Sequence, residues 1–188
     1  MVSIESTIRE FSESASSGQM RIFVASCAER TAQLFTGLIG ANGERSQDVE
    51  LAIRCMDLLW QSQPQISWDE IAESFSSFPE LTGDEEPPGL LAYAYDAAAM
   101  LYYAARYRAA GKLADVISCS NHALNSAEYI SEELEDGVDR YEIELQNQVD
   151  DIALLSQTGN PDDHDSIQLM RDSAQKFARA RLAELTSV

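Results

Sequence analysis

The stretch from Glu128 to Asp151 holds the densest set of groups in the chain that could do chemistry. Ten carboxylates stand there against one base, Arg140. They are Glu128, Glu132, Glu133, Glu135, Asp136, Asp139, Glu142, Glu144, Asp150 and Asp151. Carboxylate oxygens are ligands that magnesium prefers, and dense charge of one sign attracts basic partners and repels nucleic acid. The stretch could therefore hold a metal, bind a basic protein, or simply keep the chain soluble.

Metal-dependent hydrolysis requires carboxylates on facing helices. Glu132, Glu135 and Asp136 are spaced i, i+3, i+4, which predicts one helical face. All-α nucleoside triphosphate pyrophosphatases hold magnesium between such faces. Two pairs could provide the opposite face: Glu70 with Glu73, and Asp139 with Glu142. The first pair is on a short helix and the second follows a glycine, so neither forms a clear opposite face. A pyrophosphatase-like hydrolase is therefore the alternative and not the favoured interpretation.

Other catalytic patterns are missing from the sequence. Neither His122 nor His164 follows a glutamate by three residues, as di-iron bundles require. The three cysteines lack zinc spacing, and there is no phosphate-binding glycine loop. We expect no enzyme activity, no cofactor and no metal site. The acids after Pro161 are expected to begin a helix.

Binding of a basic protein is the favoured interpretation. The whole chain carries a net charge of −19, so neither nucleic acid nor an anionic membrane is an expected partner. The predicted docking residues are Glu128, Glu132, Glu135, Asp136, Asp139 and Glu142. Small acidic immunity proteins block the basic clefts of nucleic-acid-acting toxins, and by analogy we predict an inhibitor of this type.

The elements that would position these residues are predicted to be helical throughout. Apolar residues recur at three- and four-residue steps in eight segments, and no strand pattern appears. The segments begin near Ile4, Met20, Val49, Ser67, Leu90, Lys112, Val138 and Ile167. We predict an all-α, single-domain bundle of about eight helices over residues 1–188. Within it lie an acidic loop at 82–89 and an acidic helical region at 128–151.

Location is predicted from what the sequence lacks. The longest apolar run, Leu90 to Ala105, is too short and too polar to span a bilayer. The N-terminus shows no signal peptide, and three widely spaced cysteines are typical of a reducing compartment. We expect a cytoplasmic protein. The tyrosine-rich helix from Tyr93 to Tyr107 allows a further alternative, a homodimer or larger homo-oligomeric scaffold that uses this helix as its interface.

A buried ion-pair network is predicted between the second and third helices. If the chain turns near Asn42 and Gly43, the two helices are antiparallel neighbours. Arg30 would then face Asp57, or Glu29 would face Arg54. The structural interpretation is a network that sets the register of the helices, and the functional alternative is a small polar pocket that also includes Asp96.

Three motifs in order carry a resemblance to a known family. They are Cys27-Ala28-Glu29-Arg30, Asp57-x-x-Trp60 and Ala94-Tyr95-Asp96-Ala97. Over roughly residues 18–136 the chain resembles the YjaG-like family of uncharacterised bacterial proteins, with Gln33 where that family usually has proline. The resemblance implies an all-helical cytoplasmic fold and supplies no activity.

Overall fold

A computed structural model describes residues 3–41, 43, 45–83 and 90–186, and these residues form nine helices and no strand. The predicted all-α fold is confirmed. The helices are α1 (Ile4–Ser14), α2 (Ser17–Gly40), α3 (Ser46–Leu59), α4 (Trp68–Ser76), α5 (Pro79–Thr82), α6 (Leu90–Ala110), α7 (Leu113–Leu134), α8 (Arg140–Gln157) and α9 (His164–Thr186). The element that the sequence analysis did not separate is α5, a single turn that begins at a proline.

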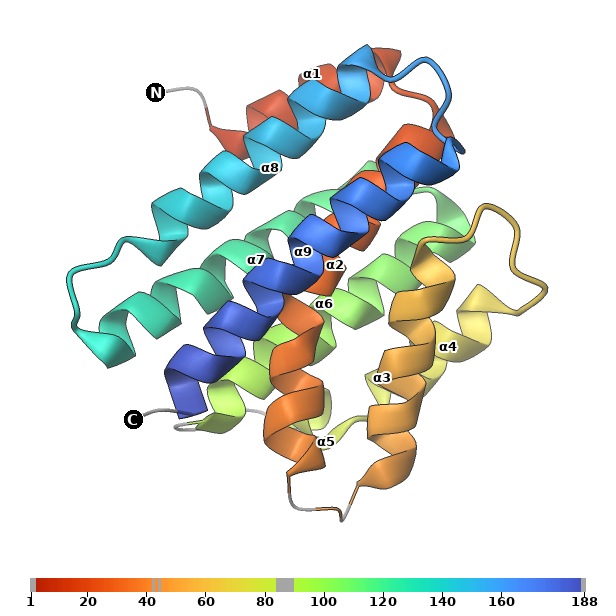
Figure 1. The fold of residues 1–188 in the computed structure, drawn as a ribbon. Coiled ribbons are helices and arrows are strands. Elements are labelled where there is room, and N and C mark those ends of the chain that lie inside the picture. The colour runs from red at the N-terminus through yellow and green to blue at the C-terminus, as the bar shows by residue number, and fades with distance from the viewer. Residues whose placement is uncertain (1–2, 42, 44, 84–89, 187–188) are drawn as a thin grey trace.

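Helix α2 is the centre of the bundle (Figure 1). It contacts α3, α6, α7, α8 and α9, and Phe23 and Phe35 on it are fully buried. Its burial also extends to polar and charged side chains, among them Arg21, Glu29 and Arg30. Buried charges persist in folded proteins only when they are paired and hydrogen-bonded, so α2 requires partners from the helices around it.

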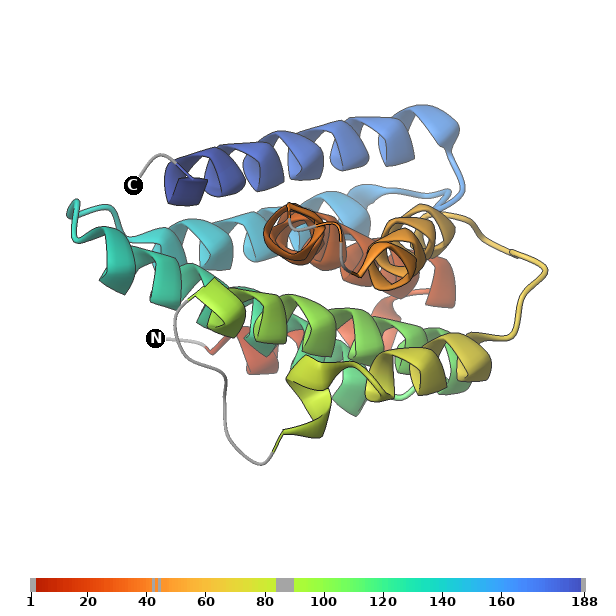
Figure 2. The ribbon, with the colours of Figure 1, turned by 90° about the horizontal axis from the view of Figure 1, so that it is seen from below.

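The other helices cover α2 from two sides. Figure 2 shows α9 outside α2 on one side and α6 with α4 on the opposite side. Helix α6 packs against α2, α4 and α7, and its Tyr93 and Tyr107 are buried. Much of this helix is therefore used within the chain, and a homo-oligomer with this helix as its interface stays a prediction.

The acidic region is not one continuous helix. Helix α7 ends at Leu134, and Glu135 follows in the left-handed conformation with a φ of 44°. Gly137 also has positive φ, at 77°, and the chain then starts α8 at Arg140. The turn breaks the predicted helical face of Glu132, Glu135 and Asp136, since the last two residues lie beyond the helix.

Some predictions fall partly outside the described residues. Of the predicted acidic loop 82–89, only Thr82 and Gly83 are described, and Asn42 in the predicted turn is not. In the described part of the chain, no helix is long and apolar enough to cross a membrane. Cys27, Cys55 and Cys119 are buried free thiols.

Candidate functional site: the acidic surface of α7 and α8

Helix α8 buries charged and polar residues beside apolar ones, and leaves other apolar residues exposed. Its buried positions include Arg140, Glu144 and Gln148, spaced by four residues on one face. In contrast, Ile143 is 41% exposed and Leu154 is 43% exposed. The buried face also contains Ile152 and Leu155, so it mixes polar and apolar side chains, whereas helices of soluble proteins usually bury an apolar face. Val138, just before α8, and Tyr141 in its first turn are also exposed.

The buried face of α8 pairs with the central helix. The Arg30 Nε donates to Glu144 Oε1 at 3.0 Å, and its Nη1 donates to Asp151 Oδ2 at 2.6 Å. Arg181 from α9 donates to the other oxygen of Glu144 at 2.7 Å. Gln148 also donates to Glu144, at 3.1 Å. The network thus joins α2, α8 and α9 with two positive and two negative charges.

The network determines the ionisation of its members. Burial alone would raise the pKa of the Glu144 carboxyl, but the charges of Arg30 and Arg181 outweigh it and leave this pKa below its usual value. Burial opposes the charged form of Arg30, yet Glu144 and Asp151 raise the pKa of its guanidinium. Both groups are therefore held in their charged forms in the core.

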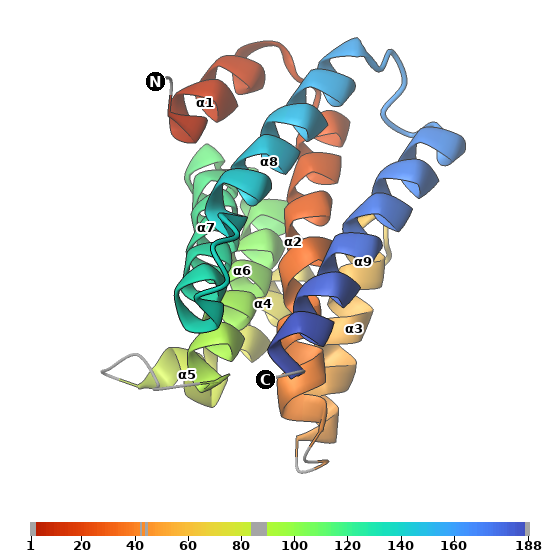
Figure 3. The ribbon, with the colours of Figure 1, turned by 60° about the vertical axis from the view of Figure 1, so that its left-hand side comes forward.

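The predicted Arg30–Asp57 and Glu29–Arg54 pairs are wrong. The Glu29 carboxylate accepts from Trp60 Nε1 at 2.9 Å and from Gln175 Nε2 at 3.1 Å. Asp57 bonds to Arg171 of α9. Arg54 is exposed on α3. The physical reason is that α8 and α9 also lie beside α2 (Figure 3). Groups from these two helices pair with Arg30 and with Asp57 instead.

Asp96 lies in a different place from this network. Its Oδ1 is 2.8 Å from Nδ1 of His122 on α7, and Tyr103 stacks on the His122 ring with centroids 5.5 Å apart. Asp96 and His122 line a pocket of about 530 Å³, together with Glu128 and Glu132. A carboxylate that fixes one histidine tautomer is a common arrangement for general bases. The described lining of this pocket contains no serine, cysteine or lysine that such a base could activate.

The acidic stretch divides into paired and unpaired carboxylates. Glu144 and Asp151 bind Arg30, and Asp136 binds Arg140 at 2.6 Å. The hydrogen bonds from Arg140 hold the pKa of the Asp136 carboxyl well below its usual range. Arg140 also bonds to Glu184 of α9 at 3.0 Å, so the one base of the stretch has two acidic partners.

The remaining seven carboxylates of the stretch are exposed and make no ion pair among the described residues. They are Glu128, Glu132, Glu133, Glu135, Asp139, Glu142 and Asp150. We call these seven residues the acidic surface. Asp139 also caps α8, because its side chain accepts from the Glu142 amide at 2.9 Å. Five of the six predicted docking residues thus belong to the acidic surface, whereas Asp136 is paired.

A groove borders this surface between α8 and α9. Its volume is about 450 Å³, and Arg30 and Asp151 of the buried network contribute to its lining. Apolar side chains line it from both helices: Leu154 from α8, and Leu169 and Phe177 from α9. Leu169 is 67% exposed, the highest value of any large apolar side chain in the described chain. Acidic and apolar groups therefore occur together on this side of the molecule.

No metal site accompanies the carboxylates in the described residues, since no three His, Cys, Asp or Glu side chains gather as a metal ion requires. The acids after Pro161 bind protein groups: one caps a helix and one forms an ion pair. The Asp163 side chain accepts from the Ser166 amide at 3.0 Å at the start of α9. Asp162 bonds to Arg21.

Comparisons with protein-family models, with curated proteins and with solved structures gave no significant match. The resemblance to the YjaG-like family therefore stays a prediction from the three motifs. Function has to be inferred from the geometry of this chain alone.

Proposed function

We propose that the protein binds a basic partner protein through the acidic surface and the exposed apolar residues of α8. The observation that carries this proposal is the exposed side of α8, where Ile143 and Leu154 lie among the unpaired carboxylates Glu142 and Asp150. Carboxylates alone would be enough to keep the protein soluble, and exposed apolar side chains do not serve that purpose. Exposed apolar side chains among unpaired charges of one sign are typical of a docking surface.

The partner is expected to present a basic surface with apolar pockets. Seven unpaired carboxylates repel one another and destabilise the isolated protein, and a basic partner would neutralise them. Proteins that act on nucleic acid have such basic clefts. We therefore propose an inhibitor of the immunity type, which occupies the cleft of a nucleic-acid-acting protein.

Apolar anchor variants test the proposal. A partner is first captured at low salt on the immobilised protein and identified, and its affinity is then measured in purified form. Replacing both Ile143 and Leu154 with serine should weaken that affinity at least tenfold, while the circular dichroism spectrum stays unchanged. The matched control is Ile53→Ser on α3, because Ile53 is 48% exposed on another helix. Equal affinity of both variants and the wild type would contradict the proposal.

A further inference from the structure

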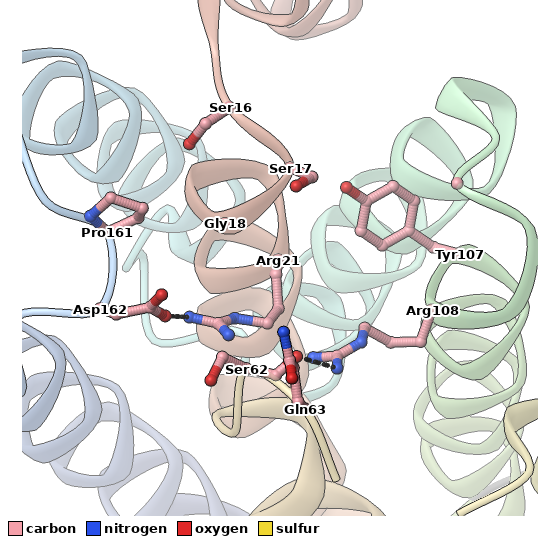
Figure 4. A pocket seen from close by; sticks show the side chains of 11 residues that line it. Ser16, Ser17, Gly18, Arg21, Ser62, Gln63, Tyr107, Arg108, Pro161 and Asp162 are labelled. Carbon is pink, nitrogen blue, oxygen red and sulfur yellow. Dashed lines mark hydrogen bonds and ion pairs between the residues drawn. The ribbon is translucent and has the colours of Figure 1, made fainter.

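A second pocket lies where the start of α2 meets the end of α6 (Figure 4). Its volume is about 450 Å³, and the segments after α3 and α8 complete its wall. Two arginines line it, Arg21 and Arg108, against one carboxylate, Asp162. Positive charge is thus concentrated here in a chain whose net charge is −19.

Arg21 has a buried donor that the described residues leave unused. The residue is 5% exposed, and its Nη2 donates to Asp162 Oδ1 at 2.7 Å. Its Nε is buried without a hydrogen-bond partner. A buried guanidinium N–H without an acceptor costs free energy, so the described residues pair Arg21 incompletely. Asp162 itself is exposed on the segment between α8 and α9.

Arg108 approaches from the opposite side and bonds to neutral groups. Its Nη1 donates to the carbonyls of Leu59 and Gln61 at 3.1 and 2.9 Å, and its Nη2 donates to the carbonyl of Ser62 at 3.3 Å. Burial, followed by the nearby charge of Arg21, lowers the pKa of Arg108 to about 10. The two guanidinium groups therefore repel each other, and an anion between them would relieve this repulsion.

The first backbone amides of α2 also favour an anion in this pocket. The first backbone bond of the helix runs from the Met20 amide to the Ser16 carbonyl, so the amides of Ser17 and Gly18 precede it. Amides in this position carry the positive end of the helix dipole and bind phosphate oxygens in many proteins. A Cβ at Gly18 would lie 2.7 Å from Pro161 Cγ, which shows how closely the α8–α9 segment approaches here.

We propose that this pocket binds a small phosphate-bearing molecule, with the phosphate held by Arg21, Arg108 and the first amides of α2. The pocket is larger than a phosphate group, and the rest of the molecule would lie beside Tyr107. Asp162 competes with the phosphate for Arg21. The proposal is independent of the docking function, because it uses neither the acidic surface nor the exposed residues of α8.

Calorimetric titration of the 188-residue chain with inorganic phosphate and with pyrophosphate tests the site. Chloride keeps the ionic strength constant, so that general screening does not contribute. We expect saturable binding at one site, and Arg108→Gln should weaken it at least tenfold, which corresponds to the loss of one charge-assisted hydrogen bond. Arg179→Gln, at an exposed arginine of α9, should leave it unchanged and is the control.

Asp162→Asn provides a second test that leaves both arginines in place. It frees Arg21 for the ligand, and phosphate affinity should rise about tenfold. A purely structural role of the Arg21–Asp162 pair predicts no gain. The proposal is overturned if neither the wild type nor Asp162→Asn binds phosphate or pyrophosphate saturably. Wild-type binding that Arg108→Gln leaves intact would also overturn it.

Discussion

Arg30 and Glu144 are 114 positions apart in the chain, yet Arg30 Nε lies 3.0 Å from Glu144 Oε1 in the core. Arg181 holds the second oxygen of the same carboxylate at 2.7 Å. This contact connects the central helix to α8 and fixes which face of α8 is buried. The exposed face of α8, with its carboxylates and apolar side chains, follows from that orientation.

Loss of Glu144 should destabilise the fold strongly. In Glu144→Gln, Arg30 and Arg181 stay buried with less compensating charge, and such a loss costs about 3–5 kcal/mol of unfolding free energy. Urea denaturation measures this cost. Arg9→Gln is the control, since Arg9 and Glu5 form an exposed pair on α1, worth at most about 1 kcal/mol. Similar midpoints for the two variants would show that the network does not support the fold.

The stability difference between the wild type and Glu144→Gln should depend on pH. The pKa of Glu144 is lowered in the folded protein, so the unfolded chain binds its proton first as the pH falls. The contribution of Glu144 is therefore complete above its unfolded pKa of about 4.3 and is lost as the pH falls through the folded pKa. Urea midpoints at pH 6 and at about pH 3.5 should show the difference narrowing in acid. A difference that is equal at both values would contradict the assigned pKa shift.

The orientation of α8 predicts opposite results at two neighbouring leucines. Leu155 is 1% exposed and Leu154 is 43% exposed. Leu155→Ala should cost about 2–5 kcal/mol of unfolding free energy, as truncations in a core do. Leu154→Ala should change it by at most about 0.5 kcal/mol. Chemical denaturation of the two variants side by side is sufficient, and equal losses would show that the helix is rotated from the orientation described.

Glu135 is strained by its backbone, which offers a test within the acidic surface. Its φ of 44° is left-handed, a conformation that costs non-glycine residues about 1–2 kcal/mol. Glu135→Gly should therefore raise the unfolding free energy by about 1 kcal/mol. Glu133→Gly, inside the last turn of α7, should lower it by about as much. If Glu135→Gly destabilises the protein to the same extent as Glu133→Gly, the turn differs from the one described.

Local structure was predictable from the sequence, and tertiary pairing was not. Periodicity alone indicated all the longer helices, because their apolar residues recur at helical spacing. It also indicated that Arg30 lies beside apolar residues, where a charged side chain requires a partner of opposite charge. Its partners come from α8, whose buried positions Arg140, Glu144 and Gln148 are polar and therefore have no hydrophobic signal. Their spacing of four residues was the one available sign of a polar buried face.

Tertiary pairing also decides which acidic residues of the 128–151 stretch are buried, and the sequence does not show this. A count of charges treats Glu144 and Glu142 alike, although the structure buries the first and exposes the second. The sequence predicts separate helices before and after Gly137. The earlier end of α7, at Leu134, depends on the left-handed Glu135, a conformation that glutamate rarely adopts. The pocket at Arg21 and Arg108 was missed because its parts come from four separate segments of the chain.

Docking of a basic partner on the acidic surface can be measured as a rate. The most direct measurement is the association rate of the captured partner by stopped flow, between low and physiological salt. Glu132→Lys with Glu142→Lys is compared with Glu50→Lys and Glu73→Lys, which change the net charge equally at exposed residues of α3 and α4. The first pair should slow association about tenfold or more, and the control pair far less. Wild-type association should fall steeply with salt. Equal rates for the two double variants, with little dependence on salt, would contradict it.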